Sequence, residues 1–163
     1  DLPYPGGPHI ERIALEGNSS AYDFPRPMIH SNNLNLSFSG LKTAVLYFIE
    51  KMSKDNPDFV KENLYDICAS LQFTIVDYLM DKIKNAVKAT NIQTIAIGGG
   101  VSANSGIRKA LQDTETSLGW KVHIPKLEYC TDNAAMIAIV GELKYQQQLF
   151  ASNDVVAKAR MKY

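Results

Sequence analysis

Three consecutive glycines, Gly98 to Gly100, form a segment suited to binding an anion. They follow an apolar run from Ile92 to Ile97, which predicts a strand, and Asn104 follows them just before a predicted helix from about Ser105 to Leu111. Glycine lets the main chain approach a phosphate closely with positive φ, and a helix start adds partial positive charge at the same place. The pattern therefore indicates a nucleotide-binding loop, with a plain tight turn as the alternative.

Two charged residues near predicted helix starts add to this chemistry. Asp132 opens the last predicted helix, where a carboxylate either caps the N-terminus or binds a metal ion or substrate. Lys42 lies in the segment Ser37–Thr43, which joins a predicted strand to a helix. That segment is not a Walker A loop, because a leucine separates its glycine from its lysine and the first glycine is missing. Lys42 either reaches a phosphate or lies solvated on a helix face.

Several other kinds of site find no support in the sequence. The histidines, His9, His30 and His123, form neither an HxxxH nor an HExxH pair, so the chain alone lacks the three or four ligands of a stable metal site. A GxSxG elbow and the carboxylate pair of a glycosidase are also missing. Cys68 and Cys130 form no CxxC pair. We expect Cys68 in the core, Cys130 partly exposed, no disulfide between them, and a cytoplasmic location.

Composition fits one globular domain. Apolar residues make up 45% of the chain and charged residues 21%, and the formal net charge is zero. This balance argues against a free-standing nucleic-acid-binding protein, which is usually basic, but it allows a nucleic acid held mainly by a partner subunit. The sequence has neither a signal peptide at its start nor the run of about 20 apolar residues that spans a bilayer, so we expect no membrane association.

The apolar patterns alternate between helix and strand, which predicts an α/β fold. Helices are predicted over Ile10–Leu15, Leu41–Lys51, 60–88 (one helix or two joined end to end) and from about 132; strands over Leu34–Phe38, Asn91–Ile97 and Lys121–Pro125; and a loop over 18–33. The strand before the glycines is suited to the middle of a sheet covered on both faces. Ala134 to Val140 are apolar nearly all round, which predicts burial on every side.

Four segments together resemble the TsaD/Gcp/Kae family, the tRNA N6-adenosine threonylcarbamoyltransferases. They occur in family order and span nearly the whole chain: Tyr4–Pro8, Ser37–Thr43, Ile97–Asn104 and Cys130–Ala138. The resemblance implies that residues 1–163 are the C-terminal half of a bacterial-type member. It further implies part of an actin-like ATPase fold, shared with sugar kinases and heat-shock chaperones, that lacks its N-terminal lobe. The final helix, from about 132, would pack toward that missing lobe.

The resemblance also implies an activity. The family transfers the threonylcarbamoyl group from threonylcarbamoyl-adenylate to N6 of the adenosine beside the tRNA anticodon. ATP, ADP or the adenylate would bind in the cleft between the lobes, near one divalent metal ion, iron or zinc. Partner subunits of the TsaB and TsaE type would complete the complex. The isolated chain is expected to be inactive and, because truncation exposes apolar surface near Val140, to dimerise.

Individual residues carry over where the motifs match. Gly7 and Asn104 match substrate or nucleotide contacts, and Glu11 stands where many members have an acidic residue that contacts ribose. Asp132 matches a metal ligand, whose two histidine companions belong to an HxxxH pair in the N-terminal half. The N–H groups of residues 98 to 100, with Gly99 and Gly100 counted among the binding residues, would hold the leaving phosphate. No residue is identified as the catalytic base.

The sequence is also compatible with two other functions. The chain is compatible with another actin-like phosphotransferase, such as a small-molecule kinase. It is also compatible with an inert scaffold or partner-binding piece. The segments Ser37–Thr43 and Cys130–Ala138 favour the transferase. A protease finds no support, because no protease constellation is present.

Overall fold

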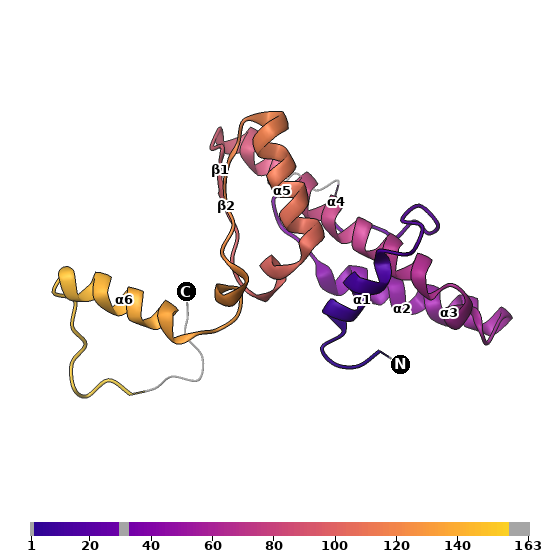
Figure 1. The fold of residues 1–163 in the computed structure, drawn as a ribbon, viewed down its shortest axis with the longest axis horizontal. Coiled ribbons are helices and arrows are strands. Elements are labelled where there is room, and N and C mark those ends of the chain that lie inside the picture. Colours follow the sequence, from indigo (N-terminus) through magenta and orange to yellow (C-terminus); the bar gives the residue numbers. More distant parts are fainter. Residues whose placement is uncertain (1, 30–32, 157–163) are drawn as a thin grey trace.

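The computed structural model describes residues 2–29 and 33–156, which form an α/β arrangement with a small parallel sheet (Figure 1). Residue 1, residues 30–32 (His30 and part of the predicted loop 18–33) and residues 157–163 lie outside this range. The elements in chain order are α1 (Gly6–Ala14), α2 (Phe38–Asp55), α3 (Phe59–Glu62), α4 (Leu64–Thr90), β1 (Thr94–Ala96), the 3₁₀ helix η1 (Gly100–Ala103), α5 (Ser105–Leu118), β2 (Lys121–His123), the 3₁₀ helix η2 (Leu127–Tyr129) and α6 (Ala134–Gln146).

Helix α4 is the element on which the candidate site is built. The apolar pattern over 60–88 allowed one helix or two joined end to end, and the structure has the second arrangement, with α3 preceding the 27-residue α4. Asn91 ends α4 in the left-handed conformation, with φ of 57°. Both α1 and α5 pack against α4, so residues from distant parts of the sequence meet on its surface (Figure 1).

Two apolar clusters line α4. One gathers near its N-terminal half and includes Phe24, Leu41, Phe59 and Ile67. The other lies under the sheet and α5 and includes Met80, Ile107, Leu111 and Trp120. Side chains of this size each contribute about 1.5–3 kcal/mol when they are fully buried. The position of α5, which carries much of the site, is therefore fixed by the second cluster.

The sheet confirms both predicted strand positions but is smaller than expected. Strands β1 and β2 pair in parallel, with Ile95 opposite Val122, and α5 connects them. Each strand is three residues long, and β1 has β2 as its neighbour within the described residues. Thr94 and Ala96 are exposed, so the expectation of a central strand covered on both faces is wrong for this chain. The apolar pattern at 92–97 predicts a strand, but it does not indicate how many strands pair with it or whether helices cover its two faces.

The strand predicted over Leu34–Phe38 is wrong. Residues 34–37 form no strand, and Phe38 is the first residue of α2. Ser37 is the N-cap of that helix: its Oγ accepts a hydrogen bond from the Gly40 N–H at 3.4 Å. The alternation of apolar and polar residues therefore belongs to a non-helical segment that leads into the start of α2. No strand of the described residues pairs with this segment.

Helix α6 contradicts the predicted burial of Ala134 to Val140. None of its residues is buried, and Ile137 remains 77% exposed. In Figure 1 α6 stands apart from the other helices at the end of a connecting segment. The prediction was wrong because apolar side chains all round a helix require covering elements, and residues 2–29 and 33–156 supply none. No helix in those residues combines the length and apolar character that a bilayer crossing requires.

Candidate functional site

The glycine loop has the predicted strand–loop–helix order. Strand β1 leads into the exposed residues Gly98 to Gly100, η1 follows, and Asn104 begins α5. Gly99 has φ of 82°, a conformation that other residues rarely adopt, so a glycine is required there. Helix α5 starts at Ser105 as predicted but continues beyond Leu111 to Leu118. Gly119 then ends it in the left-handed conformation.

Asn104 occupies the centre of a hydrogen-bond network between α1, α4 and α5. Its Oδ1 accepts from the Ile107 N–H at 3.0 Å, which makes it the N-cap of α5. The same Oδ1 accepts from Gln72 Nε2 at 2.8 Å, and Nδ2 donates to Gln72 Oε1 at 3.1 Å. Nδ2 also donates to Glu11 Oε2 at 3.3 Å, and the other oxygen of Glu11 accepts from the Ser105 N–H at 2.7 Å. A single amide thus links three helices.

A pocket of about 290 Å³ lies beside this network. It is lined by Gly7, Glu11, Gly100 and Asn104, together with Gln72 and apolar side chains such as Ile10 and Val101. Four of the residues that sequence reasoning selected for ligand binding therefore meet at one pocket, although Glu11 and Asn104 are 93 residues apart in the sequence. Gly99 is next to the pocket in sequence but does not line it.

A larger hollow, of about 570 Å³, lies elsewhere, between α4 and α5. It is lined by residues such as Phe73, Met80, Lys84 and Asp113, and none of the predicted site residues belongs to it. We favour the smaller pocket as the functional site, because the last residue of the glycine run, a carboxylate and two side-chain amides gather there with apolar walls.

Arg108 connects the glycine loop with the segment that leads to Asp132. Its Nη1 donates to the Ser102 carbonyl at 2.9 Å, and its Nη2 donates to the Pro125 carbonyl at 2.8 Å. Nη1 also lies 3.8 Å from Cys130 Sγ. The guanidinium therefore holds the loop after β1 and the loop after β2 in one arrangement, since its fixed fork of donors suits two carbonyls at once.

Replacing Arg108 with methionine in the full-length protein is expected to loosen both loops. Two hydrogen bonds from a charged group are lost, each contributing about 1.5–3 kcal/mol. Amide hydrogen exchange should rise in residues 98–104 and 125–131 and stay unchanged in the middle of α4. Arg108→Lys is the matched control and should restore only part of the protection, because one ammonium cannot reach both carbonyls with the same geometry. Unchanged exchange in Arg108→Met would contradict the bridging role.

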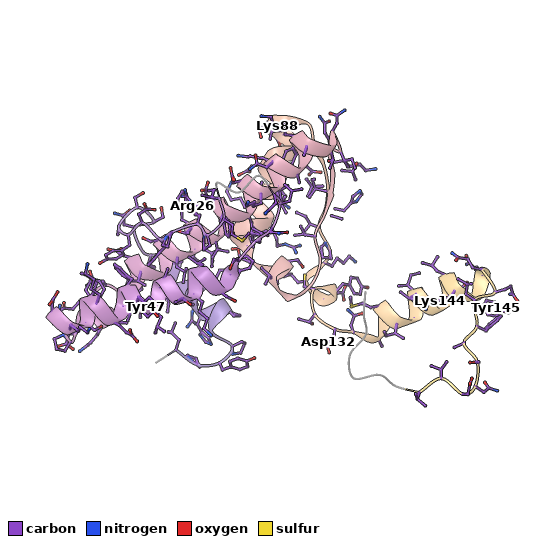
Figure 2. The ribbon with its side chains drawn as sticks, turned by 180° about the vertical axis from the view of Figure 1, so that it is seen from behind. Arg26, Tyr47, Lys88, Asp132, Lys144 and Tyr145 are labelled. Carbon is purple, nitrogen blue, oxygen red and sulfur yellow. The ribbon has the colours of Figure 1, made fainter. Side chains whose placement is uncertain are left out.

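Asp132 is exposed and lies where the chain leaves the main body toward α6 (Figure 2). The N-cap of α6 is the next residue, Asn133, whose Oδ1 accepts from the Met136 N–H at 3.1 Å. The helix-cap interpretation of Asp132 is therefore wrong. Within residues 2–29 and 33–156, no three His, Cys, Asp or Glu side chains gather as a metal site would require. Asp132 does not line the 290 Å³ pocket, and within the described residues it belongs to no cluster of possible metal ligands.

The chain 1–163 is accordingly expected to bind Zn²⁺ weakly. A single exposed carboxylate gives little affinity without further ligands. Calorimetric titration with Zn²⁺ or Fe²⁺ should show no tight one-to-one event, and Asp132→Ala should leave the isotherm nearly unchanged. Tight stoichiometric binding that disappears in Asp132→Ala would refute this prediction.

Lys42 and the cysteines complete the set of sequence candidates. Lys42 is exposed on α2 and lines a hollow of about 250 Å³, which shares Leu71 and Ile75 with the 290 Å³ pocket. Cys68 and Cys130 are both free and both buried, so partial exposure of Cys130 was wrong. Burial raises the pKa of the Cys68 thiol, which therefore stays protonated near neutral pH.

Sequence reasoning missed Gln72 and Arg108. Gln72 left one signal: it is a polar amide on α4 whose neighbours one turn away, Cys68 and Val76, are apolar. A polar residue on an apolar helix face needs a hydrogen-bond partner, but the sequence does not say which one. Arg108 left no such signal, because an arginine in the first turns of a helix is ordinary on a protein surface.

Comparison with known proteins adds evidence of relationship. Residues 1–139 match the family model TsaD, described as tRNA N6-adenosine threonylcarbamoyltransferase. Proteins of that name are 56% identical in Christiangramia forsetii, 49% in Riemerella anatipestifer and 45% in Thermosipho africanus. These alignments cover 98–99% of this chain and 46–47% of each relative. The chain thus spans about half the length of the curated relatives it matches.

Proposed function

Because the chain belongs to the TsaD family, we propose that the full-length protein is a tRNA N6-adenosine threonylcarbamoyltransferase and that residues 1–163 supply one wall of its active-site cleft. The donor would be threonylcarbamoyl-adenylate. In the reaction, N6 of an adenosine in tRNA forms a bond to the carbamoyl carbon. The bond from that carbon to the phosphate oxygen breaks, AMP leaves, and the N6 amine loses one proton.

The observation that carries this proposal is the meeting of Gly7, Glu11, Gly100 and Asn104 at one pocket. Its volume of about 290 Å³ is at the lower end for small-molecule sites, which range from about 300 to 1,000 Å³. We therefore assign it to the nucleoside part of the adenylate. The phosphate would then lie over the exposed N–H groups of Gly98 to Gly100, beside the start of α5.

Each polar group has a distinct task in this proposal. The Glu11 carboxylate would accept hydrogen bonds from ribose hydroxyls, and Asn104 would hold Glu11 in place. The apolar walls, such as Ile10 and Val101, would exclude water from the base. The glycine N–H groups would stabilise the negative charge of the departing phosphate. Together these residues bind and orient the donor.

A divalent ion, iron or zinc, belongs to the proposal as a cofactor of the full-length protein. Asp132 would be one ligand, and we place the remaining ligands in the N-terminal half of the full-length protein. The lack of a group of three His, Cys, Asp or Glu side chains among residues 2–29 and 33–156 supports this placement. When bound, such an ion would supply Lewis-acid stabilisation of charge on the carbonyl. The described residues alone do not form the site of this ion.

The wider setting follows from the same family. We propose an actin-like ATPase fold for the full-length protein, with residues 1–163 in the C-terminal portion and α6 packed against the N-terminal lobe. We further propose tRNA and subunits of the TsaB and TsaE type as partners, and the cytoplasm as the location. The exposed apolar surface of α6 supports the packing, since such a helix gains stability only when it is covered.

One assay tests the proposal. The full-length protein is incubated with threonylcarbamoyl-adenylate and tRNA, and the digested nucleosides are analysed by mass spectrometry alongside AMP release. We expect threonylcarbamoylated adenosine and AMP in equal amounts, and none from the chain 1–163 alone. Phosphorylation of a sugar by the full-length protein, without modified tRNA, would instead favour a small-molecule kinase. If neither product forms with the partner subunits present, the transferase proposal is wrong.

A further inference from the structure

Gln72 forms a reciprocal pair with the Asn104 side chain. Gln72 Nε2 donates to Asn104 Oδ1 at 2.8 Å, while Asn104 Nδ2 donates to Gln72 Oε1 at 3.1 Å. Gln72 is half-buried near the middle of α4 and lines the 290 Å³ pocket. Helix α4 packs against both α1 and α5, so the Gln72 amide is attached to the element that the other two helices of the network contact.

The partners of Asn104 give its amide one favoured orientation. The Ile107 N–H can only donate, so it requires the oxygen of Asn104. The Glu11 carboxylate can only accept when ionised, so it requires the nitrogen. With Gln72 in place, both N–H bonds of Nδ2 and both lone pairs of Oδ1 are engaged. A flipped amide would lose the bonds to Ile107 and Glu11, and in a half-buried position that loss is costly.

Gly106 gives a second, independent observation, because its lack of a side chain leaves room for the Gln72–Asn104 pair. A Cβ atom at Gly106 would lie 2.7 Å from Gln72 Nε2, 3.1 Å from Val76 Cγ2 and 3.3 Å from Asn104 Oδ1. The first distance is too short for a real contact, so the Gln72 amide would have to move. Gly106 lies within α5, where alanine is otherwise the better helix former. The glycine is therefore explained by the room that Gln72 needs.

We propose that Gln72 is a positioning residue of the ligand pocket, which holds the Asn104 amide with its nitrogen toward Glu11. This inference deepens the proposed function and rests on it for the identity of the ligand. With Gln72 removed, Asn104 keeps its bonds to Ile107 and Glu11 but loses the shorter of the two hydrogen bonds that restrain its nitrogen. Glu11 keeps its bond from the Ser105 N–H, but the Asn104 N–H group that contacts its other oxygen is less well held, so the carboxylate is placed less precisely for a ribose.

Three variants of the full-length protein test the proposal. Gln72→Met keeps the length and apolar stem of the side chain but removes both hydrogen bonds. Gly106→Ala displaces the Gln72 amide without altering either member of the pair. Gln112→Met is the matched control, because it makes the same chemical change at an exposed position of α5. Thermal unfolding is measured for each, so that folding and positioning are separated.

We expect both Gln72→Met and Gly106→Ala to raise the Kd for ADP and the KM for the adenylate about tenfold. The KM for tRNA should stay unchanged. The variant with both substitutions should bind ADP no more weakly than the single variant with the lower affinity, because both substitutions disrupt the same Gln72–Asn104 pair. Gln112→Met should behave as wild type. If Gln72→Met lowers only the unfolding temperature and leaves Kd and KM unchanged, Gln72 is merely structural and the proposal is overturned. Gly106→Ala decides the matter if Gln72→Met does not fold.

A ligand-free measurement separates this inference from the proposed function. With ¹⁵N-labelled asparagine and glutamine, the side-chain N–H signals of Asn104 should exchange slowly with water in the wild type and quickly in Gln72→Met. Equal exchange rates in the two proteins would overturn the positioning role whatever the ligand is. A wild-type protein that transfers nothing and binds no ADP would instead refute the proposed function, while slow exchange would still support the pair.

Discussion

Replacing Asn104 with alanine in the full-length protein is expected to weaken binding of ADP and of the adenylate by about 1–3 kcal/mol, a factor of about 5 to 150. The substitution removes one of the two donors that hold Glu11 and, at the same time, the partner of Gln72. It also leaves the Gln72 amide without that partner in a half-buried position. The ligand would then have to organise these groups itself, at the expense of its affinity.

The same substitution should lower stability, because Asn104 is also the N-cap of α5. Loss of such a cap costs about 0.5–2 kcal/mol. Asn104→Asp separates the two effects. Aspartate keeps an oxygen for the Ile107 N–H but places a second oxygen where Nδ2 now faces Glu11 Oε2 at 3.3 Å. We expect Asn104→Asp to retain most of the stability and to lose affinity at least as strongly as Asn104→Ala.

Isothermal titration with ADP and denaturant unfolding are the two measurements. The prediction is confirmed if the affinity for ADP falls in both variants and the free energy of unfolding falls mainly in Asn104→Ala. If both variants bind ADP as the wild type does, Asn104 does not belong to the site. Affinity that falls only in step with stability would assign Asn104 a capping role and nothing more.

The site could be predicted to the extent that local chemistry determines it. A run of glycines between a strand and a helix start indicates a backbone with positive φ, which Gly99 adopts. The start of α5 was predicted correctly, and Asn104, a favoured N-cap residue, stands directly before it. The meeting of Gly7 and Glu11 with that loop depends on how α1 packs on α4, and neither sequence spacing nor periodicity contains that information.

The errors arise where a local pattern depends on surroundings that the sequence does not show. Residues 34–38 alternate as a strand does, yet Ser37 gives the backbone a helix cap instead. Asp132 has the residue type of a helix cap, but Asn133 takes that position one residue later. Gln72 was missed for a related reason: its partner lies 32 residues away, on another helix.

The exposed helix α6 leads to the second large effect, self-association of the chain 1–163. Apolar side chains on all its faces remain open to solvent, among them Ile137 at 77%, Ile139 at 56% and Val140 at 50% exposure. Burying one such side chain contributes about 1.5–3 kcal/mol, so a few from each copy offset the cost of association. We expect light scattering to show a mass that rises with concentration over the micromolar range.

Charge placed on α6 should abolish this association. Ile137 and Ile139 lie on different sides of the helix, so Ile137→Glu with Ile139→Glu interrupts its apolar surface in two directions. Gln146→Glu with Gln147→Glu adds the same charge at the polar end of the segment and is the matched control. We expect the first pair to give a monomer and the second to associate as the unaltered chain does. A chain that is monomeric at high concentration without any substitution would show that α6 does not drive association.

The same pair, Ile137→Glu with Ile139→Glu, can also be placed in the full-length protein. If it lowers the stability of that protein and leaves its mass unchanged, then α6 is covered there by the rest of the protein, because a glutamate is costly only where the helix is buried.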